Sequence, residues 1–202
     1  SGIERHRTRL AEIKPRVLVG QFGGAAGTLA SLTEHGFAIQ DGLMKELGLR
    51  TPEATWHTMR DTLTESVTFL GLVTGTLAKI GCDIALMMQT EVGEVYEPFL
   101  PGRGSSSTMP QKRNPHQSQD VMAYAAQIRT MVPLAMESVM TEHEANRQTS
   151  LMMRYAEREV CTLMGDTLER VRLLAEGLVL KPERMRANLD LPDGLIMAEP
   201  MM

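Results

Sequence analysis

The sequence predicts an all-α fold, built as a bundle of long helices. Apolar residues recur at three- and four-residue steps over three segments, at about residues 60–88, 115–139 and 150–176. No stretch shows the alternating pattern of a strand, and glycine and proline gather between the periodic segments. Helices of about 25–30 residues exceed the globular mean of about 11–12. Their apolar stripes are therefore expected to be buried by other helices, of this chain or of partner subunits.

Shorter elements precede the long helices. Residues 4–20 are polar and basic, with aliphatic residues at helical spacing, and are predicted to form the first helix. The Gly-rich segment 21–28 follows a helix rather than a strand, so a break or a close packing of helices is favoured over a phosphate-binding loop. Residues 29–48 are predicted to form short helices, closed by Gly48 and a turn at Pro52.

Glycine and proline mark the long helices. Gly71 and Gly75 lie one turn apart in the first. Because a glycine costs about 1 kcal/mol in a helix interior, we expect another helix to approach closely there. Pro115 begins the second helix, since the first helical position needs no N–H. The third helix ends at Gly177. A short helix is predicted to begin at residue 181 and to end at about residue 189.

The composition, 43% hydrophobic and 23% charged, is typical of a water-soluble protein. A formal net charge of -4 offers no surface for nucleic acid or for an anionic membrane. The 16 Met are interpreted as flexible core filling rather than as metal ligands. Cys82 and Cys161 are expected to be free, buried thiols in a reducing cytoplasm. We expect neither a signal peptide nor an apolar run long enough to span a bilayer.

The two ends of the chain predict a piece of a longer protein. The chain opens directly in a charged helical pattern and stops just as an apolar segment begins. The prediction is a central helical-bundle domain over residues 1–190, with a long loop at 98–115. Residues 191–202 are expected to start a C-terminal domain, and an N-terminal domain is expected to be absent.

The most specific pattern lies in the long loop. Residues 105–115 read SSSTMPQKRNP, with hydroxyl side chains, a lysine and an asparagine among helix-breaking residues. Such a polar, glycine-flanked loop is suited to holding an anion and moving a proton. The pattern resembles the signature loop of the fumarase/aspartase superfamily, usually written G-S-S-x-M-P-x-K-x-N-P. This resemblance implies the central domain of that fold, in an enzyme that makes or breaks a C–N or C–O bond beside a carboxylate.

The resemblance also implies a role for the residues of the loop. Ser106, six positions before the loop lysine, is the implied base that removes the proton alpha to the substrate carboxylate. Lys112 and Asn114 would hold the carboxylate and stabilise the resulting dianion. Further contacts with the carboxylate are implied for Ser107, Thr108 and Met109. No metal and no organic cofactor is implied. Ser105 stands where the family usually has glycine, which leaves open whether Ser106 or a neighbour is the base.

Other positions favour one branch of the superfamily. Gln119 stands seven residues after the loop lysine, where fumarases and adenylosuccinate lyases typically carry a glutamate. The bacterial 3-carboxy-cis,cis-muconate cycloisomerases also lack that glutamate, and the segments 21–29, 56–61 and 88–98 resemble them further. Gln89, in the last segment, is a predicted substrate contact. The implied reaction is the reversible lactonisation of 3-carboxy-cis,cis-muconate, in which a carboxylate adds across a double bond.

The polar break between the second and third long helices supplies further candidates. His143 is predicted either to contact the substrate or to have a structural role. Ala145 stands where the muconate enzymes usually carry an arginine, and Arg147 follows two residues later as a predicted carboxylate contact. Because arginine binds carboxylates bidentately, a displaced arginine is compatible with a different acid as substrate. His57 is predicted either to contact the substrate or to cap or pack against a helix. Three histidines are expected at the surface: His6, His35 and His116.

The resemblance extends to partners. It implies a cytoplasmic homotetramer in which three subunits contribute to each active site, a small polycarboxylate as substrate, and neither nucleic acid nor membrane as partner. The general acid would lie outside this chain, so the chain alone is expected to be inactive or nearly so. Adenylosuccinate lyase, or another lyase that releases fumarate, is the alternative enzyme. The alternative from another class is a non-catalytic helical assembly protein, as in the crystallin relatives of this superfamily.

Overall fold

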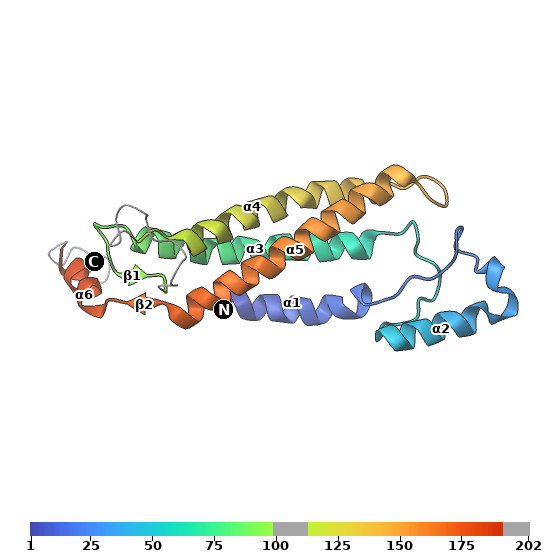
Figure 1. Cartoon of the computed structure of the whole chain (residues 1–202), viewed down its shortest axis with the longest axis horizontal. Helices are drawn as coiled ribbons and strands as arrows, with labels where there is room; N and C mark the ends of the chain where they lie inside the picture. Colours follow the sequence, from blue (N-terminus) through green and yellow to red (C-terminus); the bar gives the residue numbers. More distant parts are fainter. Residues whose placement is uncertain (99–112, 192–202) are drawn as a thin grey trace, which may run out of the picture. The chain divides into compact units, whose positions relative to one another are not determined.

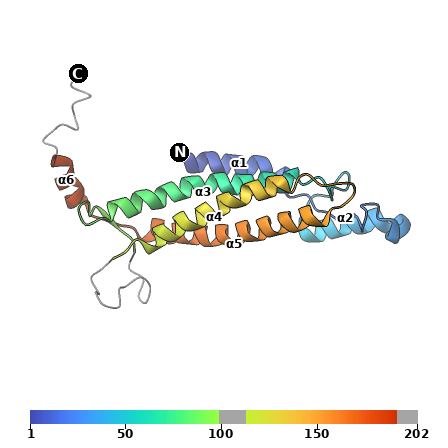
Figure 2. The same cartoon turned by 90° about the horizontal axis from the view of Figure 1, so that it is seen from above.

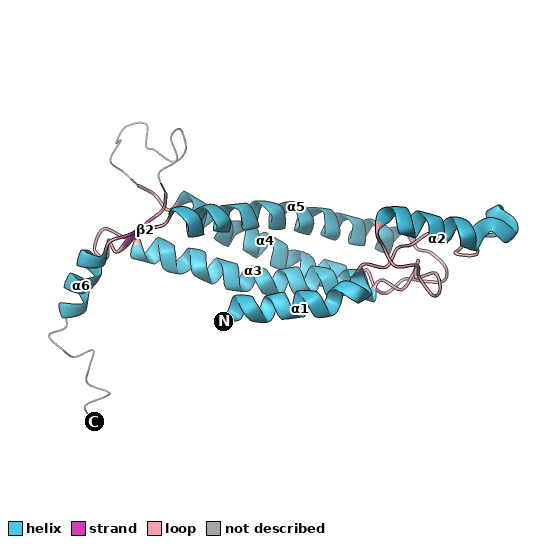
Figure 3. Cartoon of the chain, turned by 90° about the horizontal axis from the view of Figure 1, so that it is seen from below, coloured by secondary structure: helices cyan, strands magenta, loops and turns pink. Residues whose placement is uncertain are grey.

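The structure of the chain is a computed structural model that describes residues 1–98 and 113–191. Helices make up nearly all of its regular structure (Figures 1 and 3), which confirms the all-α prediction. In chain order the elements are α1 (Gly2–Val17), the 3-10 helix η1 (Ala30–His35), α2 (Gly36–Leu47), α3 (Asp61–Met87), β1 (Val95–Tyr96), α4 (His116–Glu137), α5 (Arg147–Gly177), β2 (Val179–Leu180) and α6 (Pro182–Asp190).

The chain divides into two compact units, which are described separately. The first unit consists of residues 1–76 and 126–164, and the second of the described part of residues 77–125 and 165–202. The first unit therefore holds α1, η1 and α2, the start of α3 and α5, and the end of α4. The second holds the remaining parts of the three long helices together with β1, β2 and α6.

Each unit is built around the apolar stripes that the periodicity predicts. Buried side chains recur along the long helices at three- and four-residue steps, as expected for one face of a helix. In the first unit these are Val67, Val73, Ile128, Ala135, Met153, Ala156 and Val160. In the second unit they are Leu77, Ile84, Val121, Ala125 and Leu174. Burying one aliphatic side chain of this size contributes about 1.5–3 kcal/mol, so the stripes dominate the stability of both units.

In the first unit, α1 lies beside the start of α3 (Figure 2). His6 is buried and shares a hydrogen bond with Thr76, with 2.8 Å between Nε2 and Oγ1. At the other end of α1, Arg16 donates to the carboxylate of Glu65. This ion pair is half-exposed and contributes little stability, about 0–1 kcal/mol. The buried side chains of α1, His6 and Ile13, therefore contribute more to its packing than the ion pair does.

The Gly-rich segment 21–28 forms a loop between helices, as favoured by the sequence. Its turn needs the left-handed backbone of Gly24 and Gly27, which have φ of 72° and 77°. Side chains from later in the chain hold the loop in place. Gln40 donates to the carbonyl of Phe22 over 2.6 Å, and the indole N–H of Trp56 donates to the carbonyl of Gly20 over 2.7 Å.

The structure corrects several expectations. Two strands of two residues each, β1 and β2, pair antiparallel, although no strand was expected. They are too short to produce an alternating pattern. The expectation that His6 lies at the surface is wrong, because this side chain is only 8% exposed. Cys82 and Cys161 are free, as expected, but both are exposed in this chain rather than buried.

The apolar character of α3 also differs from the expectation. Among the described helices, α3 is long and apolar enough to cross a membrane by length and composition, so the statement that no such run exists is wrong. The helix nevertheless packs as part of a protein core. Thr64 in α3 donates to the carbonyl of Ala135 in α4 over 3.1 Å, and Val67 is 1% exposed. These contacts show that the first turns of α3 pack into the core of the bundle.

The two glycines of α3 behave differently. A Cβ on Gly71 would lie 2.8 Å from Cγ2 of Val132 in α4, whereas a Cβ on Gly75 would meet no described atom within 4 Å. The expected close approach is thus confirmed at Gly71 and wrong at Gly75 within the described chain. Val132 is β-branched and its χ1 is stiff, so it cannot easily move away from an added methyl group.

These two positions give a matched pair of variants. We expect Gly75→Ala to raise the free energy of unfolding by about 1 kcal/mol, because alanine favours the helix. Gly71→Ala gains the same helix propensity but overpacks against Val132, which costs about 1–3 kcal/mol. Urea unfolding of both variants should place Gly71→Ala below Gly75→Ala by that amount. Equal stability of the two variants would contradict the contact between Gly71 and Val132.

Acidification should weaken the first unit through His6. Burial lowers the pKa of His6, and the nearby guanidinium groups of Arg9 and Arg5 lower it further. The unfolded chain, with an ordinary histidine pKa of about 6.5, then binds more protons than the folded chain. Stability is fully present above about pH 6.5 and is lost as the pH falls towards the folded pKa. Urea midpoints at pH 7.5 and 5.5 should therefore differ more for the wild type than for His6→Gln.

His35→Gln is the control for this pH dependence. His35 is exposed on η1, so its variant should keep the full loss of stability between pH 7.5 and 5.5. If His6→Gln and the wild type lost stability in parallel, the burial of a neutral His6 would be contradicted.

Candidate active site

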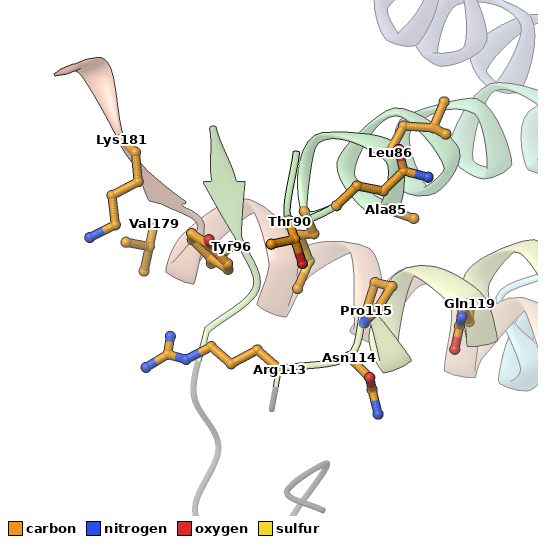
Figure 4. A pocket seen from close by; sticks show the side chains of 12 residues that line it. Ala85, Leu86, Thr90, Tyr96, Arg113, Asn114, Pro115, Gln119, Val179 and Lys181 are labelled. Atoms are coloured by element: carbon orange, nitrogen blue, oxygen red, sulfur yellow. The ribbon is translucent and has the colours of Figure 1, made fainter. Parts of the chain in front are cut away.

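A pocket of about 730 Å³ lies in the second unit (Figure 4). Its walls come from the end of α3, from β1, from the segment that begins α4, and from β2 with the residue after it. The lining residues are Ala85, Leu86, Met88, Gln89, Thr90, Tyr96, Arg113, Asn114, Pro115, Gln119, Val179 and Lys181. Elements that are far apart in the sequence therefore meet at one concave surface.

The wall with Gln89 and Thr90 is a turn that ends α3. The carbonyl of Gln89 accepts from the backbone N–H of Val92 and of Gly93, at 3.0 and 2.7 Å. The turn requires Gly93 in the left-handed region, with φ of 62°, where glycine has no steric cost. Backbone hydrogen bonds within this turn therefore place Gln89 and Thr90 at the pocket.

Helix α6 holds this turn from outside. Arg184 donates to the carbonyls of Glu91 and Val92 over 2.6 and 2.9 Å. Asn188 donates to the carbonyl of Val92 and to the carboxylate of Glu94, both over 2.8 Å. Buried or half-buried carbonyls at a turn need such donors. The segment after β2 therefore supports the wall made at the end of α3.

The two short strands bring Tyr96 and Lys181 to the pocket. Val95 pairs with Leu180, and Tyr96 pairs with Val179. The backbone N–H of Lys181 donates to the carbonyl of Glu94 over 2.9 Å, which extends the pairing by one residue. In Figure 4 Tyr96 lies on β1, and Val179 and Lys181 lie on the neighbouring β2 segment. The unexpected strands are thus part of the pocket wall.

The third wall is the start of α4. Arg113, Asn114 and Pro115 precede the helix, and Gln119 lies in its first turn (Figure 4). The guanidinium carbon of Arg113 lies 6.0 Å from the centre of the Tyr96 ring, at the outer range of a cation–π contact. The side-chain nitrogen of Asn114 lies 3.5 Å from Nε2 of His116, the first residue of α4.

A buried carboxylate joins two of these walls. Glu97, the residue after β1, is 7% exposed and accepts two backbone hydrogen bonds from the first turn of α4. The donors are the N–H of Gln117 at 3.0 Å and the N–H of Ser118 at 2.7 Å. Helix N-termini leave such N–H groups without partners inside the helix, and a carboxylate is a favourable acceptor there.

The charge of the pocket has one sign. The lining that the structure describes contains two cationic side chains, Arg113 and Lys181, and no Asp or Glu. Amide and hydroxyl groups add neutral polar surface, from Gln89, Thr90, Tyr96, Asn114 and Gln119. Cations combined with neutral donors are the groups that bind carboxylates and other small anions. The pocket is therefore suited to a polyanionic small molecule.

The predicted site residues fall into three groups. Gln89 and Asn114 both line the pocket. The loop residues Ser106, Ser107, Thr108, Met109 and Lys112 lie outside the described residues. His143 and Arg147 belong to the first unit, where both are exposed, and His143 has a left-handed backbone with φ of 51°. His57, also in the first unit, is half-buried and lies four residues before α3 begins.

Four residues line the pocket although the sequence did not predict them there: Lys181, Tyr96, Arg113 and Thr90. Lys181 was noticed only as the start of a short helix, because nothing in the local pattern pairs it with residues 85 positions earlier. The register of β1 and β2, which creates that proximity, leaves no signal in strands of two residues. Among the described residues no three His, Cys, Asp or Glu side chains gather as a metal site would require.

Comparison with known proteins identifies the family. The family model described as Lyase matches residues 1–130. The 3-carboxy-cis,cis-muconate cycloisomerase of Pseudomonas aeruginosa is 47% identical over 201 residues, covering 98% of this chain and 43% of that protein. Trans-aconitate decarboxylase 1 of Mycosarcoma maydis is 44% identical over 206 residues, covering 98% of this chain and 40% of that protein.

A solved structure agrees with the sequence comparisons. The crystal structure of 3-carboxy-cis,cis-muconate lactonizing enzyme from Pseudomonas putida superposes with a TM-score of 0.87 at 42% identity, and the match covers 98% of this chain and 44% of that one. The chain thus spans less than half the length of these relatives. The resemblance stated from the signature loop is confirmed.

The charge of the pocket predicts the effect of removing one cation. We expect Lys181→Met, tested in the full-length protein, to weaken the binding of the saturated tricarboxylate tricarballylate about two- to fivefold, the scale of an exposed charge pair. Isothermal titration should show the difference at low salt and a smaller one at high salt, because salt screens exposed charges. Lys14→Met, on α1 of the first unit, should bind like the wild type. Equal affinities for both variants would contradict an anion site at Lys181.

Proposed function

Since the chain belongs to the lyase family, whose model it matches over residues 1–130, we propose that it supplies part of the active site of a cycloisomerase that interconverts 3-carboxy-cis,cis-muconate and its lactone. The observation that carries the proposal is the cationic pocket beside Asn114, the residue two positions after the loop lysine. The identity of 47% with a 3-carboxy-cis,cis-muconate cycloisomerase supports this substrate.

The proposed chemistry is a proton transfer beside a carboxylate. In the lactonising direction a carboxylate oxygen of the muconate adds to a double bond, and a proton is added to the carbon alpha to a second carboxylate. In the reverse direction Ser106 removes that alpha proton, the dianion forms, and the C–O bond of the lactone breaks to regenerate the free carboxylate. A serine hydroxyl is a weak base at its ordinary pKa, so nearby cations and N–H donors must stabilise the alkoxide.

Described residues fit the binding part of this scheme. Lys112 and Asn114 are proposed to stabilise the dianion, and Arg113 and Lys181 add positive charge at the same pocket. Gln89 and Gln119 offer amide N–H groups that can donate to further carboxylate oxygens. A glutamate at position 119 would add negative charge here, so Gln119 suits a substrate with several carboxylates. His143 and Arg147 remain proposed substrate contacts.

The choice of acid within the substrate class rests on two observations. Trans-aconitate decarboxylase 1 has 44% identity to the chain, and trans-aconitate is itself a tricarboxylate. Ala145, in place of the usual arginine, is a position at which a different acid would be accommodated. The proposed substrate class is therefore a small unsaturated polycarboxylate, with 3-carboxy-cis,cis-muconate as the acid expected within it.

We further propose that the protein acts as a cytoplasmic homotetramer with shared active sites. Large apolar side chains are exposed in the single chain: Phe37 on α2 is 76% exposed, Leu72 on α3 53%, and Met140 after α4 77%. Exposed apolar surface is a feature of interfaces between subunits. The predicted domain organisation, with a central bundle over residues 1–190 and a second domain beginning near 191, is part of the same proposal.

The proposal is tested by turnover in the full-length protein. We expect loss of muconate absorbance in the ultraviolet with 3-carboxy-cis,cis-muconate, and a reduction of kcat by at least about 10²-fold in Ser106→Ala, the lower end for a removed base. Ser105→Ala is the matched control, because it alters the neighbouring hydroxyl without removing the proposed base. A larger loss in Ser105→Ala than in Ser106→Ala would reassign the base.

Parallel assays separate the alternatives. Turnover of adenylosuccinate without turnover of the muconate would move the protein to the purine branch. Turnover of trans-aconitate alone would support a reaction beside a carboxylate, but it would replace the muconate by trans-aconitate as the substrate. A folded, tetrameric protein that turned over none of these acids and bound no polycarboxylate would favour the non-catalytic assembly protein.

A further inference from the structure

We propose that Glu97 is a positioning residue that locks the start of α4 to β1 and thereby fixes the distance between two walls of the pocket. The inference rests on the proposed function for its kinetic consequence, since it assigns a residue that supports the same site. Glu97 does not line the pocket itself. It acts through Tyr96, its neighbour in the chain, and through the segment of Arg113, Asn114 and Pro115.

The contacts of Glu97 link two walls that the chain itself connects only through residues 98–112. One carboxylate oxygen accepts from the N–H of Gln117 at 3.0 Å and the other from the N–H of Ser118 at 2.7 Å. Ser118 is fully buried and Glu97 is 7% exposed, so water cannot readily replace the carboxylate. A buried N–H that loses its acceptor is left without any hydrogen bond, which is costly, so the link is hard to break.

A capping side chain from the residues just before α4 would not link α4 to β1. Most helices satisfy their first N–H groups with a side chain that immediately precedes the helix. Here Pro115 has no N–H, and the Asn114 side chain lies beside the ring of His116 rather than on the N–H groups of Gln117 and Ser118. The acceptor comes instead from a residue 20 positions earlier. The first turn of α4 is thus held by the β1 wall and not by its own sequence.

The segment with Glu97 is held on its other sides as well. Val95 is fully buried and pairs with Leu180 on β2. Pro98 packs against the end of α5, because a Cβ added to Gly177 would lie 2.6 Å from Cβ of Pro98. Residues 95–98 are therefore fixed between β2 and α5, and Glu97 transmits that position to α4. Glu97 is thus a charged side chain next to β1 that links this segment to α4 by hydrogen bonds.

The consequence for the site is geometric. Neighbouring residues of an extended strand point to opposite sides, so Tyr96 lines the pocket while Glu97 faces α4. Movement of α4 against β1 would displace Asn114 from Tyr96 and Lys181. Misplacement of a substrate by about 1 Å can reduce a rate about 10²-fold. Without Glu97 we expect weaker binding of polycarboxylates and a lower kcat, with the pocket side chains themselves unchanged.

The test uses three variants of the full-length protein. Glu97→Ala removes both acceptors. Glu97→Gln keeps the length of the side chain and one acceptor oxygen, so it should retain part of the function and remains informative if the alanine variant unfolds. Glu94→Gln is the matched control, because Glu94 accepts from Asn188 on α6 and its glutamine can still accept. Circular dichroism before each measurement confirms that a variant is folded.

Three measurements are made on each variant. Amide hydrogen exchange at Gln117 and Ser118 should be about tenfold faster in Glu97→Ala, the scale of a lost helix cap, and unchanged in Glu94→Gln. The dissociation constant for tricarballylate should rise about 5–10-fold in Glu97→Ala and less in Glu97→Gln. The kcat for the acid that the wild type turns over should fall about 10–100-fold in Glu97→Ala, with a smaller change in KM.

Each outcome decides the inference. Unchanged amide exchange in both Glu97 variants would show that the link to α4 is absent and would overturn it. Faster exchange with a tricarballylate affinity and a kcat within twofold of the wild type would show a helix cap without a positioning role, which also overturns it. If the wild type binds tricarballylate but turns over no acid, the proposed function fails, and the tricarballylate affinity of the Glu97 variants still decides whether Glu97 positions the pocket.

Discussion

Burial of one apolar stripe along each long helix is the constraint on which the rest of the structure depends. The stripes of α3, α4 and α5 contain residues with no exposed surface, among them Val121, Ala125, Ile128 and Val160. A helix can rotate about its axis only if such residues leave the core, which costs about 1.5–3 kcal/mol for each large side chain. The stripes therefore fix which residues stand at the helix ends. The pocket is built at those ends, where α3 stops and α4 begins.

Polar contacts then set details that apolar burial leaves free. An apolar stripe tolerates small sliding along the helix, whereas a hydrogen bond at 2.7–3.0 Å does not. In the second unit, the carboxylate of Glu97 and the side chains of Arg184 and Asn188 all bond to backbone groups. These contacts hold the segments that form the pocket walls. Stability and precise geometry thus come from different residue types in different places.

Much of the fold follows from sequence periodicity, and the exceptions have physical causes. The stripes predicted α3, α4 and α5 with their bounds correct to within a few residues. The start of α5 was placed at Ser150 instead of Arg147, although Asn146 is a capping residue whose side chain accepts from the N–H of Gln148 at 2.7 Å. That signal was readable. The burial of His6 was not, because this residue stands among charged residues of α1 and is covered by contacts with distant residues of α3, among them Phe69 and Thr76.

The candidate site was predictable only where a motif carried it. Asn114 and Gln89 were proposed from their resemblance to a family pattern, and both line the pocket. Lys181 and Tyr96 enter the pocket through the pairing of two-residue strands, a contact between distant segments that no local pattern encodes. The role of Lys181 and Tyr96 thus depends on tertiary proximity rather than on spacing, whereas the missed Arg113 and Thr90 directly adjoin predicted residues in the sequence.

The position of Glu97 also explains how an acid can stand beside an anion pocket without opposing its charge. A carboxylate in the pocket would repel a carboxylate substrate and offset Arg113 or Lys181. Glu97 is one residue from Tyr96, yet the reversal of direction along an extended strand turns it towards α4. There its charge meets two N–H groups at the positive end of the α4 dipole. Tyr96 and Glu97 therefore face opposite sides of the chain. The pocket side keeps the positive charges of Arg113 and Lys181, and the negative charge of Glu97 lies on the side of α4.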